Sequence, residues 1–273
     1  MSRYKIFISV ILTLQAVVHI STHAQIISDS LSEKLISTDL WNDGSILRYA
    51  PEDQHLVLDM TPRLDKARKK VAGFFNSEFP EPVLITLAPN RASFTEILNN
   101  EWGIPQTACW MVATGVADFM VILSPRVWKE EACEHDPEND QHIQEIVIHE
   151  LVHVFHGQHN ETRDFTGAEE VGWFAEGIAV VVADQLSKER ILGVIEAIKK
   201  NEIPEKLINA WSGENRYGIS GSIVLYIQEK KDRSILKELL AVTSQSEFLK
   251  VIEMNEQDLL KAWEEWMINK FGN

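Results

Sequence analysis

The sequence predicts an α+β fold, with strands in most of the first half and helices in the second. Before residue 125, short runs rich in Val, Ile, Leu and Phe alternate with Pro, Gly and Asn, which is typical of strands and turns. From residue 139 onward, apolar residues recur at helical spacing. No internal repeat and no Pro/Gly/Ser-rich linker interrupts the chain, so residues 25–273 are expected to form one domain.

Residues 1–24 are predicted to be a signal peptide. Arg3 and Lys5 precede an apolar run at 6–18, and small or tolerable residues at 22–24 precede the expected cleavage before Gln25. The apolar run is too short for a good membrane span, and polar residues follow it too closely. A single N-terminal anchor helix is the alternative interpretation. We therefore expect an exported protein, periplasmic or extracellular, with no membrane span after the signal is removed.

The chain is strongly acidic, with 26 Lys and Arg against 41 Asp and Glu and a formal charge of −15. The predicted signal peptide holds two basic residues and no acidic one, so its removal makes the mature chain more acidic still. Such a protein is not drawn to nucleic acid or to anionic lipid by its charge. No nucleic-acid partner is expected, and the sequence leaves the oligomeric state open.

Three strands and one helix are predicted before residue 90. Residues 45–49 and 56–58 are expected to be short strands around Pro51, and residues 82–87 form a third strand. Residues 62–75 show helical spacing and many Lys and Arg, which indicates a surface helix.

A second β region follows a short helix predicted at 93–99. Residues 109–114 and 116–123 are expected to be strands, with a bend or bulge at Gly115. The two cysteines, Cys109 and Cys133, would meet an oxidising compartment after export. They could form a disulfide or remain buried thiols, and the sequence leaves both open.

The second half is predicted to be helical. Residues 141–156 form a helix capped by Gly157, and Thr166 with Glu169 gives a capping-box pattern that opens a second helix ending near residue 186. Further helices are expected at 189–200, 220–230, 234–242 and 256–270.

The first of these helices contains the pattern H-E-x-x-H, at His149, Glu150 and His153. Residues four apart share one helix face, so both imidazoles can bind one zinc ion. Glu150 lies about 100° around the helix, where its carboxylate can reach water at the metal but not the metal itself. The flanking residues are apolar nearly all round, which indicates a buried helix whose polar groups need partners. Two hydrogen-bonded core histidines are the alternative explanation.

A catalytic zinc site usually has three protein ligands, and Glu176 is the first candidate for the third. Its carboxylate lies in the apolar segment Trp-Phe-Ala-Glu-Gly-Ile-Ala, and Gly177 would let its helix pack closely. An ion pair with a buried base is the other explanation for this carboxylate.

His159 is the second candidate, because it has the offset of a metzincin ligand. In that pattern a glycine must stand where this chain has His156, which favours Glu176. His156 and His159 are instead expected to cap the helix end, and His135 and His142 to lie at the surface.

The motif from His149 to His153, followed by Trp-Phe-Ala-Glu-Gly-Ile-Ala at 173–179, resembles the peptidase-MA-like gluzincins, relatives of thermolysin and the zinc aminopeptidases. Segments 115–125, 217–227 and 259–266 are similar to a strand beside the substrate cleft, a helix-opening segment and a closing helix of that family. The resemblance thus extends over most of the mature chain, although only the two zinc motifs are specific.

The resemblance implies a zincin-like fold, with a small mixed sheet above the two helices that carry the ligands. It implies one Zn²⁺ per chain, held by His149, His153 and Glu176, with Glu150 as the catalytic base. It also suggests Tyr217 as a donor to the oxyanion, for which simple packing of this side chain is the alternative.

These features together predict a zinc metallopeptidase that acts on a peptide or protein substrate. Glu150 would take a proton from the attacking water and pass it to the leaving amine. A strand near 116–123 could hold the peptide by β-addition, and Val121→Pro would test this. A catalytically inactive, zinc-containing exported binding protein of the same fold is the alternative. Peptide specificity, and endopeptidase versus aminopeptidase action, are not predicted.

Overall fold

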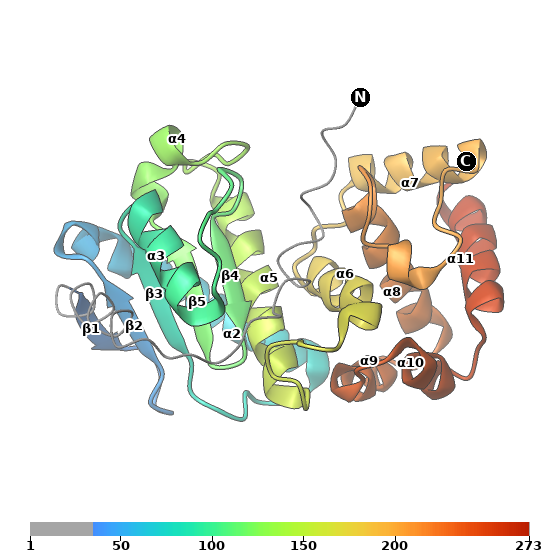
Figure 1. Ribbon diagram of the computed structural model, residues 1–273, viewed down its shortest axis with the longest axis horizontal. Coiled ribbons are helices and arrows are strands. Elements are labelled where there is room, and N and C mark those ends of the chain that lie inside the picture. Colours follow the sequence, from blue (N-terminus) through green and yellow to red (C-terminus); the bar gives the residue numbers. More distant parts are fainter. Residues whose placement is uncertain (1–34, 273) are drawn as a thin grey trace.

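The computed structural model describes residues 35–272, in which a mixed sheet is followed by a set of helices (Figure 1). The predicted signal peptide lies outside the described residues. The predicted α+β class is confirmed at this level, since the strands lie before residue 125 and later regular elements are helical.

The sheet has five strands in the order β1-β2-β3-β5-β4. Strands β2, β3 and β5 run parallel to one another, and β1 and β4 are antiparallel to their neighbours. β4 therefore forms one edge of the sheet. The bounds are β1 Ile36–Asp39, β2 Ile46–Tyr49, β3 Leu84–Ala88, β4 Ala113–Val116 and β5 Phe119–Leu123.

Four helices belong to the sheet half: α2 Gln54–Phe75, α3 Arg91–Trp102, α4 Trp128–Glu131 and α5 Asp140–His159. Helix α3 crosses the face of the sheet that is turned toward the viewer in Figure 1. Helix α5 packs against the edge strand β4, and α2 lies beside α5. This arrangement places α5 between the sheet and the remaining helices (Figure 1).

The second half consists of α6 Gly172–Val182, α7 Lys188–Lys200, α8 Arg216–Lys230, α9 Ser234–Glu238, α10 Gln245–Ile252 and α11 Glu256–Phe271. Helix α6 is the member that packs on α5, and α8 packs on α6. Helices α7 and α11 both contact α8 and lie farther from the sheet (Figure 1).

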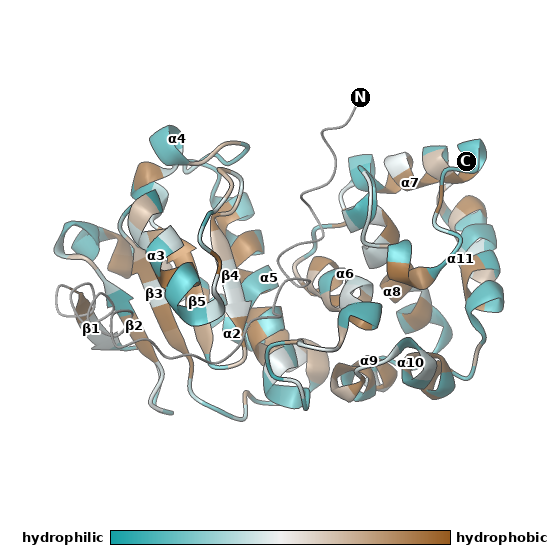
Figure 2. Ribbon diagram, viewed as in Figure 1, coloured by the Kyte–Doolittle hydropathy of each residue, from teal (hydrophilic) through white to brown (hydrophobic). Residues whose placement is uncertain are grey.

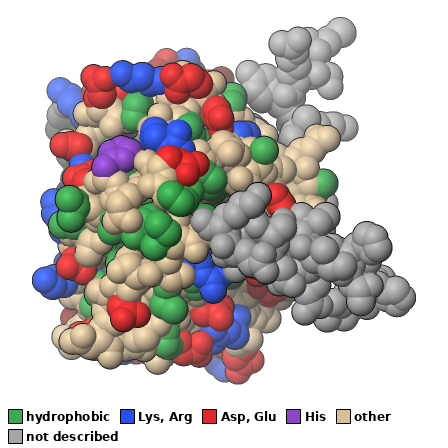
Figure 3. All heavy atoms as spheres, turned by 90° about the vertical axis from the view of Figure 1, so that its left-hand side faces the viewer, with side chains coloured by type: hydrophobic (Ala, Val, Ile, Leu, Met, Phe, Trp, Pro, Cys, Tyr) green, Lys and Arg blue, Asp and Glu red, His purple; other side chains and the backbone are tan. Residues whose placement is uncertain are grey.

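Buried apolar side chains of both halves belong to one hydrophobic cluster. Trp128 and Phe155 on the sheet side, and Trp173 and Trp263 on the helical side, are among its largest members. Figure 2 shows the result, with hydrophobic strands and with helices that turn hydrophilic residues outward. On the face seen in Figure 3, acidic and basic side chains are interspersed around apolar ones. Among the described residues, no helix is both long and apolar enough to cross a membrane.

The predicted strand at 56–58 is wrong, because these residues form the first turns of α2. The prediction placed the start of that helix at Pro62, which instead lies inside it. A proline within a helix removes the bond to the carbonyl four residues earlier. Here both Pro62 and Leu58 are exposed, so water can satisfy that carbonyl.

The predicted bend and the two predicted helix caps also differ from the structure. Gly115 is not a bend but a residue of β4, and the hairpin turns at Ala117, whose φ is +49°. Gly157 does not cap α5, which continues to His159. The residues Thr166 and Glu169 form no capping box, because the α-helix starts at Gly172 after a short 3-10 helix. Strand β1 and helices α4 and α10 were not predicted.

Cys109 and Cys133 form a disulfide, which settles the question that the sequence leaves open. His135 and His142 are not simple surface residues, because both are half-buried and their rings stack. Their nitrogens Nδ1 and Nε2 lie 2.8 Å apart, in hydrogen-bond contact.

Candidate metal centre

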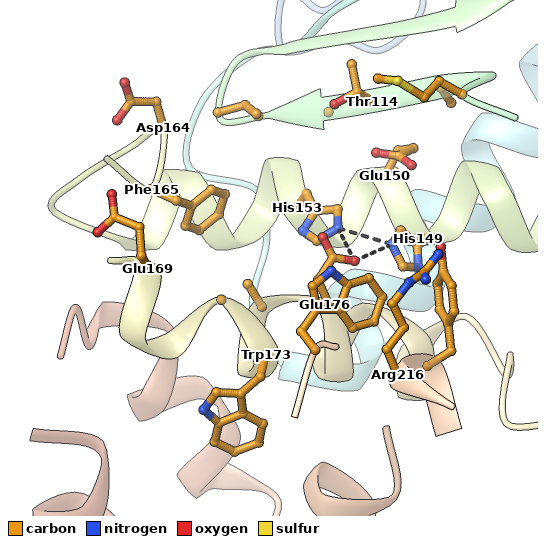
Figure 4. A pocket seen from close by; sticks show the side chains of 18 of the residues that line it. Thr114, His149, Glu150, His153, Asp164, Phe165, Glu169, Trp173, Glu176 and Arg216 are labelled. Carbon is orange, nitrogen blue, oxygen red and sulfur yellow. Dashed lines mark hydrogen bonds and ion pairs between the residues drawn. The ribbon is translucent and has the colours of Figure 1, made fainter. Parts of the chain in front are cut away.

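Helices α5 and α6 bring His149, His153 and Glu176 together (Figure 4). The potential ligand atoms of the three side chains all lie within 4.8 Å of one another. The two Nε2 atoms are 3.1 Å apart, and Glu176 Oε2 lies 3.4 Å from His149 Nε2 and 3.7 Å from His153 Nε2. The predicted cluster is therefore present, and its geometry suits a metal ion.

The position of α5 depends on its close approach to the sheet. A Cβ atom at Gly115 of β4 would lie 2.6 Å from the carbonyl oxygen of Glu150, which is too close for any other residue. Apolar residues on all sides of α5 are buried, among them Val147, Leu151 and Val154. The histidines thus project from a fixed helix.

Helix α6 is held by an equally close contact on its other side. A Cβ atom at Gly177 would lie 2.6 Å from the carbonyl oxygen of Ser220 in α8. The sequence correctly pointed to close packing at this glycine, but the partner is α8 rather than the candidate site. Because Gly177 follows Glu176 directly, this contact fixes the backbone that carries the carboxylate.

His149 has a second polar partner that defines how its ring binds. Its Nδ1 lies 2.9 Å from Oε1 of Gln185, which follows the end of α6. An amide oxygen only accepts, so Nδ1 carries the hydrogen and Nε2 presents its lone pair to the cluster. The backbone carbonyl of Gln185 accepts a bond of 2.6 Å from Arg190 Nη1, which holds this turn in place.

Electrostatics favour an ionised Glu176. Burial alone raises the pKa of this carboxyl, but His153 and His149 outweigh burial through charge and hydrogen bonds and hold the pKa well below its usual range. Its side chain is only 16% exposed. The cluster is a largely buried set of two imidazoles and one carboxylate.

Glu150 lies on the side of α5 that faces β4, close to the histidines (Figure 4). Burial raises the pKa of its carboxyl to about 7, with a further increase from Glu176 and opposing contributions from His149 and a backbone hydrogen bond of Gly115. Its carboxylate is separate from the three-ligand cluster, as the spacing of the motif predicts.

Tyr217 lines the same cleft as the cluster, as does its neighbour Arg216. Burial, followed by the charge of Glu176, raises the pKa of the Tyr217 phenol, so this group keeps its proton and can donate. The guanidinium of Arg190 lies 4.6 Å from the centre of the Tyr217 ring. Sequence reasoning missed Gln185, Arg190 and Arg216, for which no local pattern exists.

The other histidines of α5 lie outside the cluster. His159 Nδ1 binds the carbonyl oxygen of Phe155 at 2.8 Å, which fits the predicted role at the helix end rather than a metzincin ligand. His156 does not cap the helix, because it is 1% exposed and lies against the rings of Phe165 and Phe174.

The cluster opens into a cleft of about 270 Å³. All of β4, at the sheet edge, lines one side of it, and residues between α7 and α8 line another. Asp164, Phe165 and Glu169 lie at one end of the cleft beyond His153 (Figure 4). Comparison with known proteins adds nothing to this geometry, because no family model and no curated protein matches the chain.

Proposed function

We propose that this protein is a zinc-dependent hydrolase of peptide bonds. The observation that carries the proposal is the convergence of His149, His153 and Glu176 on one point, with Glu150 beside them. The resemblance to gluzincins rests on the spacing of these same residues along the sequence.

The three side chains fit zinc. Ligands about 2.0–2.1 Å from a tetrahedral ion are about 3.3 Å apart, and the observed separations are 3.1, 3.4 and 3.7 Å. Two imidazoles and a carboxylate are the ligand types of a catalytic zinc site, whereas calcium and magnesium prefer oxygen alone. The Nδ1 contact with Gln185 leaves the lone pair of His149 Nε2 directed into the cluster, where a cation can accept it.

A zinc ion held there would supply Lewis acidity, which activates water for attack and polarises the carbonyl of the substrate. Glu150 is the base in this proposal, and its carboxylate takes the proton from the attacking water and gives it to the leaving amine. Tyr217 donates its phenolic hydrogen toward the oxyanion. His149 and His153 are largely buried, which limits the access of bulk water to their ring nitrogens.

The peptide is proposed to pair with β4, which corrects the earlier expectation for Val121. Val121 lies on β5, between β3 and β4, and so has no free edge. Leu123 N donates to Val112 O at 2.7 Å, and alternation along the ladder then directs the backbone groups of Ala113 and Gly115 away from β5. These groups face the open edge beside Glu150. The Gly115 N–H already donates to the Glu150 carboxylate, so an extended chain can add at the backbone groups of Ala113 and at the carbonyl of Gly115.

The test uses residues 25–273, incubated with a diverse peptide mixture and read by mass spectrometry. Cleavage should require metal, disappear with a chelator, and return with zinc. Glu150→Gln should retain about one zinc per chain and lose turnover, whereas Glu161→Gln, at an exposed position outside the cleft, should change neither. Zinc binding without cleavage of any peptide by the wild-type protein would favour the binding-protein alternative.

A further inference from the structure

The cleft beside the metal cluster has aromatic and aliphatic walls. Trp110 and Met111, between α3 and β4, line the wall on the sheet side. Ile208 and Trp211, between α7 and α8, line the opposite wall. Ile208 is 48% exposed and is one of four large apolar side chains that are exposed among the described residues. Trp110, Met111, Ile208 and Trp211 are called the apolar walls below.

The segment that carries Trp110 has no regular structure, yet its backbone is tightly held. The disulfide joins Cys109 to Cys133, and the guanidinium of Arg91 donates to the carbonyls of both Cys109 and Met111. His135 Nε2 lies 2.8 Å from the carbonyl oxygen of Trp110. Because the other nitrogen of His135 contacts His142, the segment is also tied to α5, the helix of the metal cluster.

The opposite wall is held by aromatic contacts. The Trp211 ring packs edge-to-face on Tyr217, with 4.7 Å between ring centroids. The guanidinium of Arg216 lies 5.6 Å from the centre of the Trp211 ring. Trp211 is therefore fixed relative to α8 and to the residue that is proposed to donate to the oxyanion.

Large apolar side chains that remain accessible while their backbone is rigidly held are a feature of binding sites, since little conformational entropy is lost when a ligand covers them. An extended peptide paired with β4 directs its side chains alternately to either side of its backbone, toward the walls of the cleft. A charged side chain entering between the apolar walls would lose hydration, and none of these four side chains could pair with its charge.

We propose, resting on the peptidase function above, that the apolar walls select peptides with a large apolar side chain next to the cleaved bond. Trp110 and Trp211 contact that side chain from opposite sides, and Ile208 extends the surface. The disulfide and Arg91 act as positioning groups for Trp110.

The kinetic test compares matched peptides that differ only in Phe, Ala or Asp at each position next to a mapped cleavage site. The wild-type protein should favour Phe over Ala by about tenfold or more in kcat/KM. Trp110→Ala and Trp211→Ala should remove most of that preference through KM, with zinc content unchanged, because the metal ligands lie on other elements. Ile208→Asp should also reduce it, at a half-exposed position that is not part of the hydrophobic core cluster. Leu58→Ala, 84% exposed on α2, is the matched control and should leave the preference intact.

The positioning role is tested with the double variant Cys109→Ser/Cys133→Ser. It should lose part of the Phe preference and keep its zinc, because the metal ligands lie on other elements. An unchanged preference in this variant would remove the disulfide from the proposal.

Binding of the same peptides to Glu150→Gln separates this inference from the proposed function. Tighter binding of the Phe peptide, lost in a Glu150→Gln/Trp110→Ala protein, supports selection by the apolar walls even if the wild-type protein cleaves nothing. Cleavage with equal kcat/KM for Phe, Ala and Asp peptides would overturn the inference and leave the peptidase proposal standing. Equal losses for all three peptides in the tryptophan variants would overturn it as well.

Discussion

Replacing Gln185 by leucine should weaken zinc binding by about tenfold, through an effect on the His149 ring. In the metal-bound form His149 must carry its hydrogen on Nδ1, which donates to Gln185 Oε1 at 2.9 Å. In the metal-free form of the variant the ring can shift its hydrogen to Nε2, which lies 3.4 Å from Glu176. In the Gln185→Leu variant, therefore, only the metal-bound form keeps an Nδ1–H of His149 without an acceptor.

The size of the effect follows from burial. His149 is 8% exposed, so an unsatisfied Nδ1–H costs about 1–3 kcal/mol. A neutral acceptor is lost, which favours the lower part of that range and a change in Kd of about tenfold. Gln185→Glu keeps an acceptor and adds basicity to the ring, so its zinc affinity should equal or exceed that of the wild-type protein.

The assay is competition for zinc against a chromophoric chelator at neutral pH. Gln144→Leu is the matched control, because Gln144 is also a buried amide whose bond, 3.1 Å to the carbonyl of Arg63, is independent of the cluster. Its Kd for zinc should stay at the wild-type value. If Gln185→Leu binds zinc as tightly as the wild-type protein, the assignment of Nδ1 as the protonated nitrogen is refuted. Equal weakening in both variants would point to general destabilisation.

Three further predictions concern packing, pH and substrate pairing. Gly177→Ala should lower the unfolding free energy by about 1–3 kcal/mol and weaken zinc binding, because its Cβ meets Ser220; in the same urea titrations Gly73→Ala, with open space around it, should be neutral or stabilising. Burial lowers the pKa of His156 to about 3, so below the ordinary pKa of about 6.5 only the unfolded chain takes up this proton. Between about pH 7 and pH 5 the metal-free wild-type protein should therefore lose about 2 kcal/mol more stability than His156→Phe, and parallel losses would contradict this. Ala113→Pro removes a backbone N–H at the open edge of β4 and should raise KM without loss of zinc, whereas an unchanged KM would exclude pairing with β4.

The local part of the candidate site was predictable from the sequence. His149 and His153 share a helix face because of their spacing alone, and the apolar residues around them indicated burial. Glu176 required a longer argument, since 23 residues separate it from His153 and only the cost of a buried carboxylate connected the two. The structure brings all three together. The identity of the metal and the peptidase activity remain predictions.

The non-local part was not predictable. The hairpin joins β4, Ala-Thr-Gly-Val, to the more apolar β5. Which of the two lies at the sheet edge depends on the pairing of β5 with β3, over 30 residues away in the chain. Glycine within a strand pattern often marks a bend or bulge, which is the expectation at Gly115, whereas the actual turn uses Ala117 at positive φ. The contact between Gln185 and His149 depends on a turn after α6 that returns toward α5. The periodicity of apolar residues in the sequence gives no information about such contacts.

The width of the candidate site is set by backbone contacts rather than by side-chain packing. On one side, a Cβ at Gly115 would lie 2.6 Å from the carbonyl of Glu150, so β4 touches the turn of α5 that carries the proposed base. On the other, the same distance separates a Cβ at Gly177 from the carbonyl of Ser220, so α8 fixes the turn of α6 that carries Glu176. Backbones in contact cannot adjust as rotating side chains do. Substitutions at these two glycines should therefore change zinc affinity and KM together, whereas changes in the apolar walls should alter KM and leave zinc affinity unchanged.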